Sequence, residues 1–540
     1  MSMQSDREQV EHAAGLVAAD DEARARALDI RASWLVQAPA GSGKTELLVQ
    51  RMLALLAHVE TPERVVATTF TNKAAAEMRA RVMTALAEAR DGVAAASPHR
   101  ALTQSLARAV LAQDQAKGWR LLDYPGRIDV GTLDALAMRI ASQAPVSSLT
   151  GSAPAVVDNA WPLYRAAAQQ AIETAEAADP AWQALLRHFD NDGNRVIELL
   201  ASMLDKRDQW LTPVLSLRAS ESREALERTL ADEVERALSD LRARWPGHCL
   251  DDLAPLARHA RETRADDALL AELDARGELP RAHSSALAHW RGFADWLLTR
   301  EGSFRKSPDG FPVIGKGDGA DPRREMKVRA QAWLETLARI PGLAPALHRA
   351  RRLPDPVYSA RARAFIDALI DVLPRVAAQL LVVFAEENAC DFNEVTLRAL
   401  RALGSADEFS QVLLAQDLRI GHLLIDEFQD TSQRQLQLLE RLTSEWQPDD
   451  GHTLFVVGDP MQSIYAFREA DVRNFLDAAS SGRIGGVSVG RLALARNFRS
   501  QANLVAHVNA TFPAVLAAVA TRTSTAVGFG VAVAAVPATA

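Results

Sequence analysis

The sequence is poor in cysteine. It has only two cysteines in 540 residues, Cys249 and Cys390, and they lie far apart in the chain. This excludes a CxxC pair and a disulfide framework. It also argues against structural zinc on cysteine and against an iron–sulfur cluster held by cysteines. Such cysteine usage fits a reducing compartment, so we expect a cytoplasmic protein.

The chain also lacks an excess of basic residues and a clear membrane segment. Its 61 basic and 69 acidic residues give a formal charge of −8, unlike a histone-like protein. A local basic groove can still form on an acidic protein, so nucleic acid is not excluded. Residues 1–18 carry charges and have no apolar signal core. Residues 523–540 are uncharged, but they are rich in small residues and contain a proline, so we expect no membrane span.

What the sequence does contain is an alternation of apolar strands and amphipathic helices. Strand-like runs at 33–38 and 64–70 are followed by helical patterns at 45–58 and 72–89. This predicts an α/β fold with a parallel sheet that has helices on both faces. Helical periodicity then dominates from about residue 146 to 385, and strand-like runs return at 421–425 and 453–457. We therefore predict a helical domain inserted into an α/β domain.

One loop-rich segment of the helical region, Arg300–Arg329, holds more basic than acidic residues. It is either a solvated loop or a surface that faces nucleic acid.

A phosphate-binding loop is predicted at Ala38-Pro39-Ala40-Gly41-Ser42-Gly43-Lys44-Thr45, although Ala38 stands where the strict pattern has glycine. Small residues between a strand and a helix allow backbone N–H groups to surround phosphate oxygens. Lys44 would reach the β- and γ-phosphates, and the Thr45 hydroxyl would bind Mg²⁺.

A second acidic strand end is predicted to complete this site. Asp426 and Glu427 follow the buried run Leu423-Leu424-Ile425. Asp426 would hold Mg²⁺, and Glu427 would orient and deprotonate the attacking water. Lys44 and Asp426 are 382 positions apart (426 minus 44), which an inserted domain explains.

Six motifs then identify a family resemblance. They read APAGSGKT (38–45), TTFTNKAAAEMRARV (68–82), GTLDAL (131–136), LLIDEFQDTSQRQ (423–435), VVGDPMQSIYAFREAD (456–471) and ARNFRS (495–500). With these the chain resembles a superfamily 1 helicase of the UvrD/Rep type, and most of all its RecB/AddA-like branch. The resemblance implies a RecA-like P-loop domain (1–145 and 386–490), an inserted helical domain (146–385) and the start of a second RecA-like domain (491–540).

The resemblance also implies an activity and its site residues. The expected activity is ATP hydrolysis with Mg²⁺ that drives 3′-to-5′ DNA unwinding in recombination and double-strand break repair. Gln462 would sense the γ-phosphate, Arg499 would contact it as an arginine finger, and Phe498 would stack on adenine. The implied partners are single-stranded DNA, 3′-tailed duplex DNA and a second chain of the AddB/RecC type.

A further set of residues is implied to line the path of single-stranded DNA. Aromatic side chains suit that task because they stack on any base, at about 1–3 kcal/mol per base. Taken alone, Tyr465 and Phe467 would be interpreted as core packing near a turn. The set comprises Phe70, Thr71, Asn72, Tyr465, Phe467 and Arg468.

The chain departs from the family pattern in three respects. No glutamine occupies the adenine-reading position before the P-loop, where Arg24 or Arg26 falls instead. Phe467 replaces a tryptophan that is common in relatives. The sequence also ends soon after Ser500, which predicts a truncated chain that unwinds DNA weakly or not at all.

Two other function classes compete with a complete helicase. One is a fragment that binds ATP and single-stranded DNA with little turnover. The other is a small-molecule kinase or metabolic P-loop enzyme, which would need a compact pair of nucleotide motifs and none of the DNA motifs.

Overall fold

A parallel sheet of six strands organises the first part of the structure. In this computed structural model the strand order is β10-β1-β7-β6-β2-β3, and each neighbouring pair is parallel. The predicted α/β class with a parallel sheet is confirmed. The strands are β1 (Trp34–Gln37), β2 (Val65–Thr69), β3 (Asp129–Thr132), β6 (His422–Ile425), β7 (Thr453–Gly458) and β10 (Gly490–Ala493).

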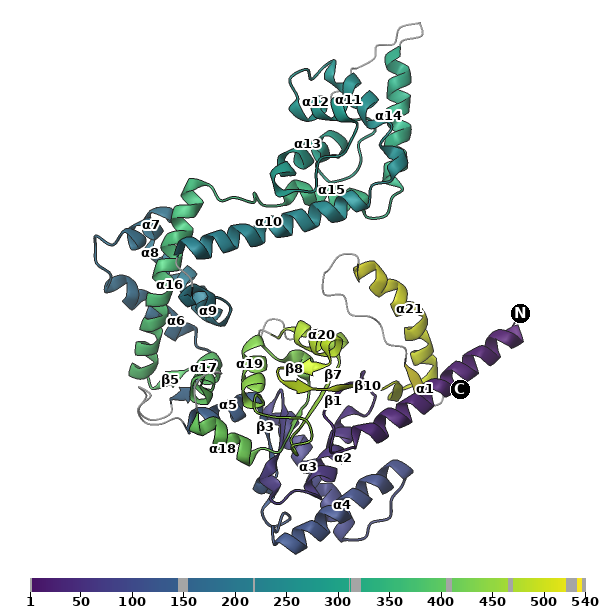
Figure 1. Ribbon diagram of the computed structural model, residues 1–540, viewed down its shortest axis with the longest axis vertical. Coiled ribbons are helices and arrows are strands. Elements are labelled where there is room, and N and C mark those ends of the chain that lie inside the picture. The colour runs from purple at the N-terminus through teal and green to yellow at the C-terminus, as the bar shows by residue number, and fades with distance from the viewer. Residues whose placement is uncertain are drawn as a thin grey trace. The chain divides into compact units, whose positions relative to one another are not determined.

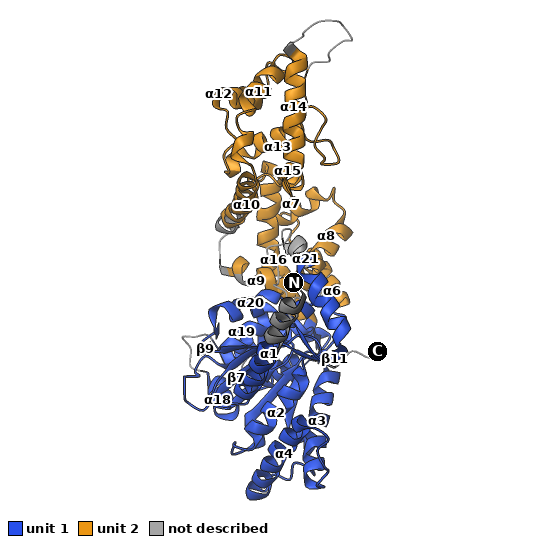
Figure 2. Ribbon diagram, turned by 90° about the vertical axis from the view of Figure 1, so that its right-hand side faces the viewer, with its two compact units in different colours: residues 1–160, 384–540 blue, residues 161–383 orange. Residues whose placement is uncertain are grey.

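The chain divides into two compact units, coloured separately in Figure 2. One unit comprises residues 1–160 and 384–540 and contains the sheet; the other comprises residues 161–383 and is helical. The structure describes residues 2–143, 154–216, 219–309, 311, 322–404, 410–464, 470–520 and 532–536. Residues 526–531, whose alternating sequence predicts a strand, lie outside these residues.

Helices cover both faces of the sheet (Figure 1). From β1 through β2 to β3 the chain crosses the sheet in one direction, and from β6 through β7 to β10 it crosses in the other. Because such crossovers are right-handed, the connecting helices of the two runs lie on opposite faces. The helices of this unit are α1 (Ser2–Ala27), α2 (Lys44–Leu56), α3 (Asn72–Arg90), α4 (Pro98–Lys117), α5 (Leu133–Ala141), α17 (Phe392–Leu403), α18 (Gln411–Arg419), α19 (Gln433–Leu442), α20 (Val472–Ser481) and α21 (Ala502–Ala520).

Local sequence signals set the helix starts next to the sheet. Thr71 and Thr132 cap α3 and α5 by accepting hydrogen bonds from Ala74 N and Ala135 N, both at 3.1 Å. Ser432 and Gln435 form a reciprocal capping box at the start of α19. These side chains satisfy N–H groups that have no partner within the helix, which fixes where each helix leaves the sheet.

Three small strand pairs complete this unit. β4 (Ala155–Val156) pairs with β5 (Ala389–Cys390), so it joins the segments on either side of the helical unit in sequence. β8 (Arg483–Ile484) pairs with β9 (Val487–Ser488). β11 (Arg496–Gln501) pairs with β12 (Val533–Val536).

The helical unit has its own apolar core. Trp290, Phe293 and Trp296 are among the largest fully buried side chains of the described residues, and they pack with Trp245 and Trp333. Its helices are α6 (Trp161–Glu173), α7 (Pro180–His188), α8 (Gly193–Asp205), α9 (Arg207–Ser216), α10 (Ala219–Ala243), α11 (Leu253–Arg261), α12 (Ala268–Arg276), α13 (Leu287–Leu297), α14 (Pro322–Ala338), α15 (Leu343–Arg352) and most of α16 (Ala360–Glu386).

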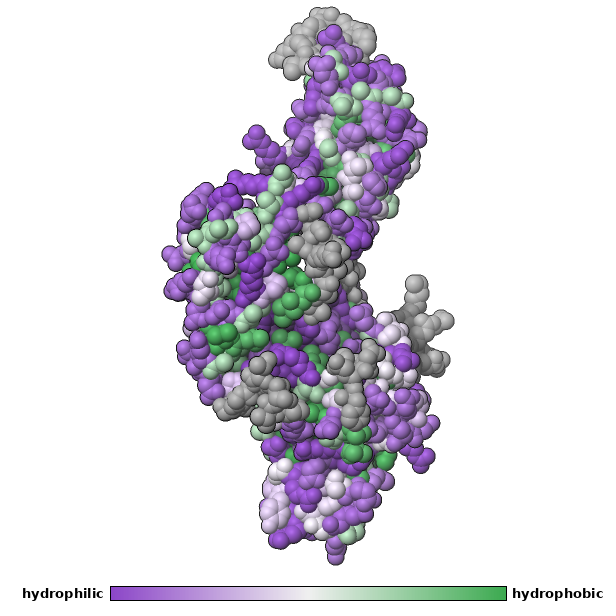
Figure 3. Space-filling view, turned by 60° about the vertical axis from the view of Figure 1, so that its left-hand side comes forward, coloured by the Kyte–Doolittle hydropathy of each residue, from purple (hydrophilic) through white to green (hydrophobic). Residues whose placement is uncertain are grey.

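Among the described residues, α16 is the one helix long and apolar enough to cross a membrane. Half of its most apolar window is buried inside the protein, and Pro374 lies within the helix. Core helices of soluble proteins can be equally long and apolar, so α16 is weak evidence for a membrane span. Hydrophilic residues predominate on the face drawn in Figure 3, with apolar residues interspersed among them.

Candidate functional site

The carboxyl edge of the sheet gathers the residues that the sequence singled out. The loop 38–43 follows β1, residues 70–72 follow β2, and Asp426 follows β6. β7, which lies between β1 and β6, ends at Gly458 and leads to Gln462. Clefts at this edge of parallel sheets are where such folds bind ligands.

The loop after β1 has the geometry of an anion-binding loop. Gly41 and Gly43 adopt positive φ angles of 79° and 76°, and Lys44 begins α2. The first N–H groups of that helix have no partner within it, so they favour an anionic ligand. The Ser42 hydroxyl oxygen is buried with no hydrogen-bond partner among the described residues. The loop therefore offers several unused polar groups to a phosphate.

Lys44 meets the two acidic residues after β6. Its Nζ lies 2.6 Å from Glu427 Oε2 and 3.7 Å from Asp426 Oδ1. Lys44 and Asp426 thus lie at one edge of the same sheet, as the sequence predicts. Thr45, the predicted second metal ligand, is the next residue of α2.

The two carboxylates differ in their surroundings. The Asp426 side chain is 8% exposed, and its burial, together with the nearby Glu427 charge, raises its pKa to about 6. The Glu427 side chain is 32% exposed. Glu427 also has a left-handed backbone, with φ of 55°, which is uncommon outside glycine and is often found at functional sites.

A buried amide connects these acids to the end of β7. Gln429 Nε2 donates to Glu427 Oε2 at 2.8 Å and to Asp430 Oδ2 at 3.0 Å. Its Oε1 accepts from Asp459 N at 2.9 Å, and Asp459 Oδ2 accepts from Gln462 Nε2 at 2.6 Å. Gln462 is therefore linked to Glu427 through side chains that the sequence did not assign to the site.

The segment after β10 lies against the phosphate loop. Phe498 N donates to Gly41 O at 2.7 Å, and Asn497 Nδ2 donates to Ala40 O at 3.2 Å. Phe498 is 42% exposed. The Arg499 side chain is exposed and forms no ion pair with the described residues.

Two residues of α1, Asp20 and Arg24, interact next to the phosphate loop, and the sequence did not predict this interaction. Asp20 is fully buried and accepts hydrogen bonds from Arg24 Nε at 2.7 Å and Ala495 N at 2.8 Å. Arg24 Nη2 donates to Ser42 O at 2.6 Å. The acidic and basic pattern around Asp20 reads as a solvated helix face, so the sequence held no signal for this contact.

The predicted DNA-facing residues are only partly described. Phe70, Thr71 and Asn72 lie at the end of β2 and the start of α3, and the last two are exposed. The Thr71 hydroxyl caps α3. The remaining three, Tyr465, Phe467 and Arg468, lie outside the described residues.

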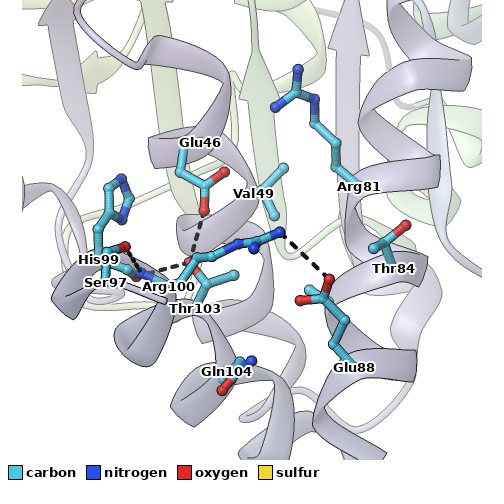
Figure 4. Close-up of a pocket in the computed structure, with 11 residues that line it drawn as sticks. Glu46, Val49, Arg81, Thr84, Glu88, Ser97, His99, Arg100, Thr103 and Gln104 are labelled. Carbon is cyan, nitrogen blue, oxygen red and sulfur yellow. Dashed lines mark hydrogen bonds and ion pairs between the residues drawn. The ribbon is translucent and has the colours of Figure 1, made fainter. Parts of the chain in front are cut away.

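A separate cavity of about 360 Å³ lies among α2, α3 and α4 (Figure 4). Glu46, in the first turn of α2, accepts a hydrogen bond from Thr103 Oγ1 at 2.8 Å on its wall. Glu88 and Arg100 form an ion pair at 3.5 Å on the opposite side. The sequence reasoning did not predict this cavity.

Comparison with known proteins agrees with the motif analysis. The chain matches the model of the UvrD/REP helicase N-terminal domain over residues 19–252 and 359–482, more than half of its length. It is 24% identical, over 88% of its residues, to an ATP-dependent helicase/nuclease subunit of Streptococcus equi subsp. zooepidemicus. It is 26% identical, over 89% of its residues, to an identically named protein of Heliobacterium modesticaldum. The chain spans 37% and 36% of the lengths of these two relatives. It belongs to the UvrD/REP helicase N-terminal domain family.

Proposed function

We propose that this chain is the ATP-binding motor part of a DNA helicase that works in recombination and double-strand break repair. The observation that carries the proposal is the meeting of Lys44 with Asp426 and Glu427 beside a loop whose backbone suits phosphate. The domain boundaries 1–145, 146–385, 386–490 and 491–540, with a RecA-like first domain and the start of a second, belong to this proposal.

The residues divide the work of ATP hydrolysis. Residues 38–45 would hold the phosphates, and Phe498 would stack on the base. Glu427 would take a proton from the attacking water, while Gln429 keeps its carboxylate oriented. Gln462 and Arg499 would respond to the γ-phosphate.

The donor set also fits Mg²⁺. A carboxylate and a hydroxyl are hard oxygen ligands of the kind that this ion binds beside phosphates. Thr45 and Asp426 would hold it, and the bound ion would neutralise charge on the β- and γ-phosphate oxygens.

We further propose that the chain moves 3′-to-5′ along single-stranded DNA, which passes Phe70, Thr71, Asn72, Tyr465, Phe467 and Arg468. DNA binding should weaken as salt rises, because phosphate contacts release counterions. The relatives are named as one subunit of a helicase/nuclease, which supports a partner chain of the AddB/RecC type. We place the protein in the cytoplasm.

The proposal is tested by separating nucleotide binding from turnover. Lys44→Ala should weaken ATP–Mg²⁺ binding by about tenfold or more, since it removes a charge-assisted contact to phosphate. Glu427→Gln should leave binding within about twofold and lower DNA-stimulated phosphate release by about 100-fold or more, since it removes the base. Equilibrium binding and phosphate release on single-stranded DNA measure the two effects.

Lys117→Ala and Glu445→Gln are matched controls, because these surface residues lie in the same unit. Equal loss of binding in Lys44→Ala and Glu427→Gln would assign Glu427 a structural role. A chain that binds ATP and single-stranded DNA without turnover would instead be a binding fragment. Unwinding of a 3′-tailed duplex, abolished by Lys44→Ala, would support a working helicase.

A further inference from the structure

Asp20 is a buried carboxylate that the nucleotide chemistry above leaves without a role. It lies in α1 and is fully buried, which is unfavourable for a charged group unless hydrogen bonds replace the lost water. Oδ1 accepts from the backbone N–H groups of Ala495 and Arg496, at 2.8 and 3.2 Å. Oδ2 accepts from Arg24 Nε at 2.7 Å. The carboxylate therefore joins α1 to the segment that follows β10.

The two backbone groups that Asp20 binds stand where the chain leaves the six-stranded sheet. β10 ends at Ala493, and β11 begins at Arg496. Hydrogen bonds to a carboxylate are stronger than those between neutral groups, so they fix the backbone at this junction. Arg499 lies in β11, and its exposed side chain has no ion-pair partner among the described residues. Its placement therefore depends on the backbone that carries it.

Arg24 extends the same contact to the phosphate loop. Its Nη2 donates to Ser42 O at 2.6 Å, so one guanidinium joins Asp20 to the loop. Its Cζ also lies 5.2 Å from the centroid of the Phe498 ring, within the range of a cation–π contact. Phe498 N in turn donates to Gly41 O at 2.7 Å. The helix, the loop and the segment after β10 thus form one connected cluster around the buried carboxylate.

We propose that Asp20 is a positioning residue for ATP hydrolysis, which holds the segment that carries Arg499 against the phosphate loop through its own contacts and those of Arg24. The inference rests on the proposed function and adds a residue that does not touch the nucleotide. An arginine that stabilises charge in the transition state must be placed closely, since a displacement of about 1 Å can lower the rate by on the order of 100-fold. Loosening the cluster should therefore slow hydrolysis and leave ATP binding almost unchanged.

The test uses the full chain and measures DNA-stimulated phosphate release in single turnovers, together with equilibrium binding of ATP–Mg²⁺. Asp20→Asn keeps the shape of the side chain but has one acceptor oxygen in place of two, so it cannot accept from both sides. The variant should lower the rate by about tenfold or more and keep ATP binding within about twofold. Glu22→Gln is the matched control, because it also replaces a carboxylate by an amide on α1, at a side chain that is 72% exposed.

Arg24→Lys is a milder second variant, so that the test does not depend on one protein folding. A lysine ammonium lacks the planar fork that reaches Asp20 and Ser42 together. This variant should lower the rate by about threefold, again with ATP binding within about twofold.

A double-mutant cycle with Arg499→Ala separates positioning from a general effect on the fold. If Asp20 acts through Arg499, Asp20→Asn should lower the rate no further once Arg499 is removed. That result, with ATP binding kept and Glu22→Gln like the wild type, would support the proposal. The same tenfold loss in the Arg499→Ala background, an unchanged rate in Asp20→Asn, or an equal loss of ATP binding would overturn it and leave the proposed function intact. Absence of phosphate release from the wild type would overturn both.

Discussion

At the scale of single residues, Gly41 shows how closely two segments approach at the nucleotide site. Its φ of 79° suits glycine, and a Cβ there would lie 2.6 Å from Asn497 Oδ1 and 2.9 Å from Arg499 Cβ. The missing side chain therefore lets the segment of Asn497, Phe498 and Arg499 rest on the phosphate loop. Any larger residue must displace one of the two segments.

We expect Gly41→Ala to separate these segments. The variant should lose about 1–2 kcal/mol because of its positive φ, and its clash should also break the hydrogen bond from Phe498 N to Gly41 O. Hydrogen–deuterium exchange of residues 495–501 should rise by about tenfold or more. Gly92→Ala is the matched control, because Gly92 has φ of 70° with nothing within 4 Å of its Cβ position. Similar exchange in the two variants would show that the contact does not depend on Gly41.

At the scale of elements, β6 begins with a half-buried histidine at the end of the sheet away from the nucleotide site. His422 Nδ1 lies 2.8 Å from the hydroxyl of Thr453, in the neighbouring strand β7. Burial, followed by the positive charges of Arg51 and Arg64, lowers the pKa of His422 from 6.5 to about 3. The folded chain therefore holds this imidazole neutral at pH values where the unfolded chain is protonated.

This predicts a loss of stability in mild acid. Because the pKa is depressed in the folded state, stability is full above about pH 6.5 and falls as the pH drops towards 3. At pH 5 the loss from His422 should be about 2 kcal/mol. His422→Asn keeps a group near Nδ1 but cannot be protonated, so it should remove this part of the pH dependence. Urea unfolding at pH 5 and 7.5 measures it.

His507→Asn provides the comparison, because His507 is exposed on α21. That variant should unfold with the pH dependence of the wild type. If His422→Asn also kept the full dependence, the acid sensitivity would have to come from other groups.

The sequence predicted the elements whose burial is uniform and missed those that depend on distant partners. Uniformly apolar runs such as Leu423–Ile425 predicted the bounds of β6 and of its neighbouring strands to within one or two residues. The short strand β10 (Gly490–Ala493) has only one fully buried residue, Leu492. It joins the sheet by pairing with β1, which lies far away in the sequence. The helix α4 was not predicted, although Ser97 caps it. Short or weakly patterned segments need tertiary contacts to define them.

The same distinction holds for the site. Lys44 and Asp426 were identified because phosphate loops and acidic strand ends have local sequence patterns. Asp20 and Asn497 were not assigned to the site, although Asn497 stands inside the motif ARNFRS, because their contacts arise only where α1 and the segment after β10 meet the loop. Nothing in the residues next to Asp20 distinguishes it from a surface polar group.

At the scale of the whole molecule, each unit has an apolar core of its own. One core covers the sheet and lies entirely in the unit that contains it, and another, around Trp290, lies entirely in the helical unit. Cooperative unfolding depends on shared buried contacts, so each core can define its own transition.

We therefore expect two transitions in calorimetry, each sensitive to a different change. ATP–Mg²⁺ at 100 times its Kd should stabilise only the unit that holds Lys44, by about 2.7 kcal/mol. Phe293→Ala should destabilise only the helical unit, by about 3–5 kcal/mol, because it empties a fully buried site. Differential scanning calorimetry with and without nucleotide tests both. A single transition that moves under both changes would contradict two independent cores.

The strand order of the sheet has a consequence for how the chain is made. β1 lies between β10 and β7, yet both neighbours are encoded more than 400 residues after it. At synthesis rates of about 5–20 residues per second, β1 emerges roughly 20–80 s before β7. During that time the backbone N–H and C=O groups along its edges have no native partner strand, although α2 and the first helices of the other unit can already form. Until β7 and β10 are synthesised, the strand that contains Leu35 and Val36 can pair with other chains, so we expect the nascent chain to need protection from aggregation.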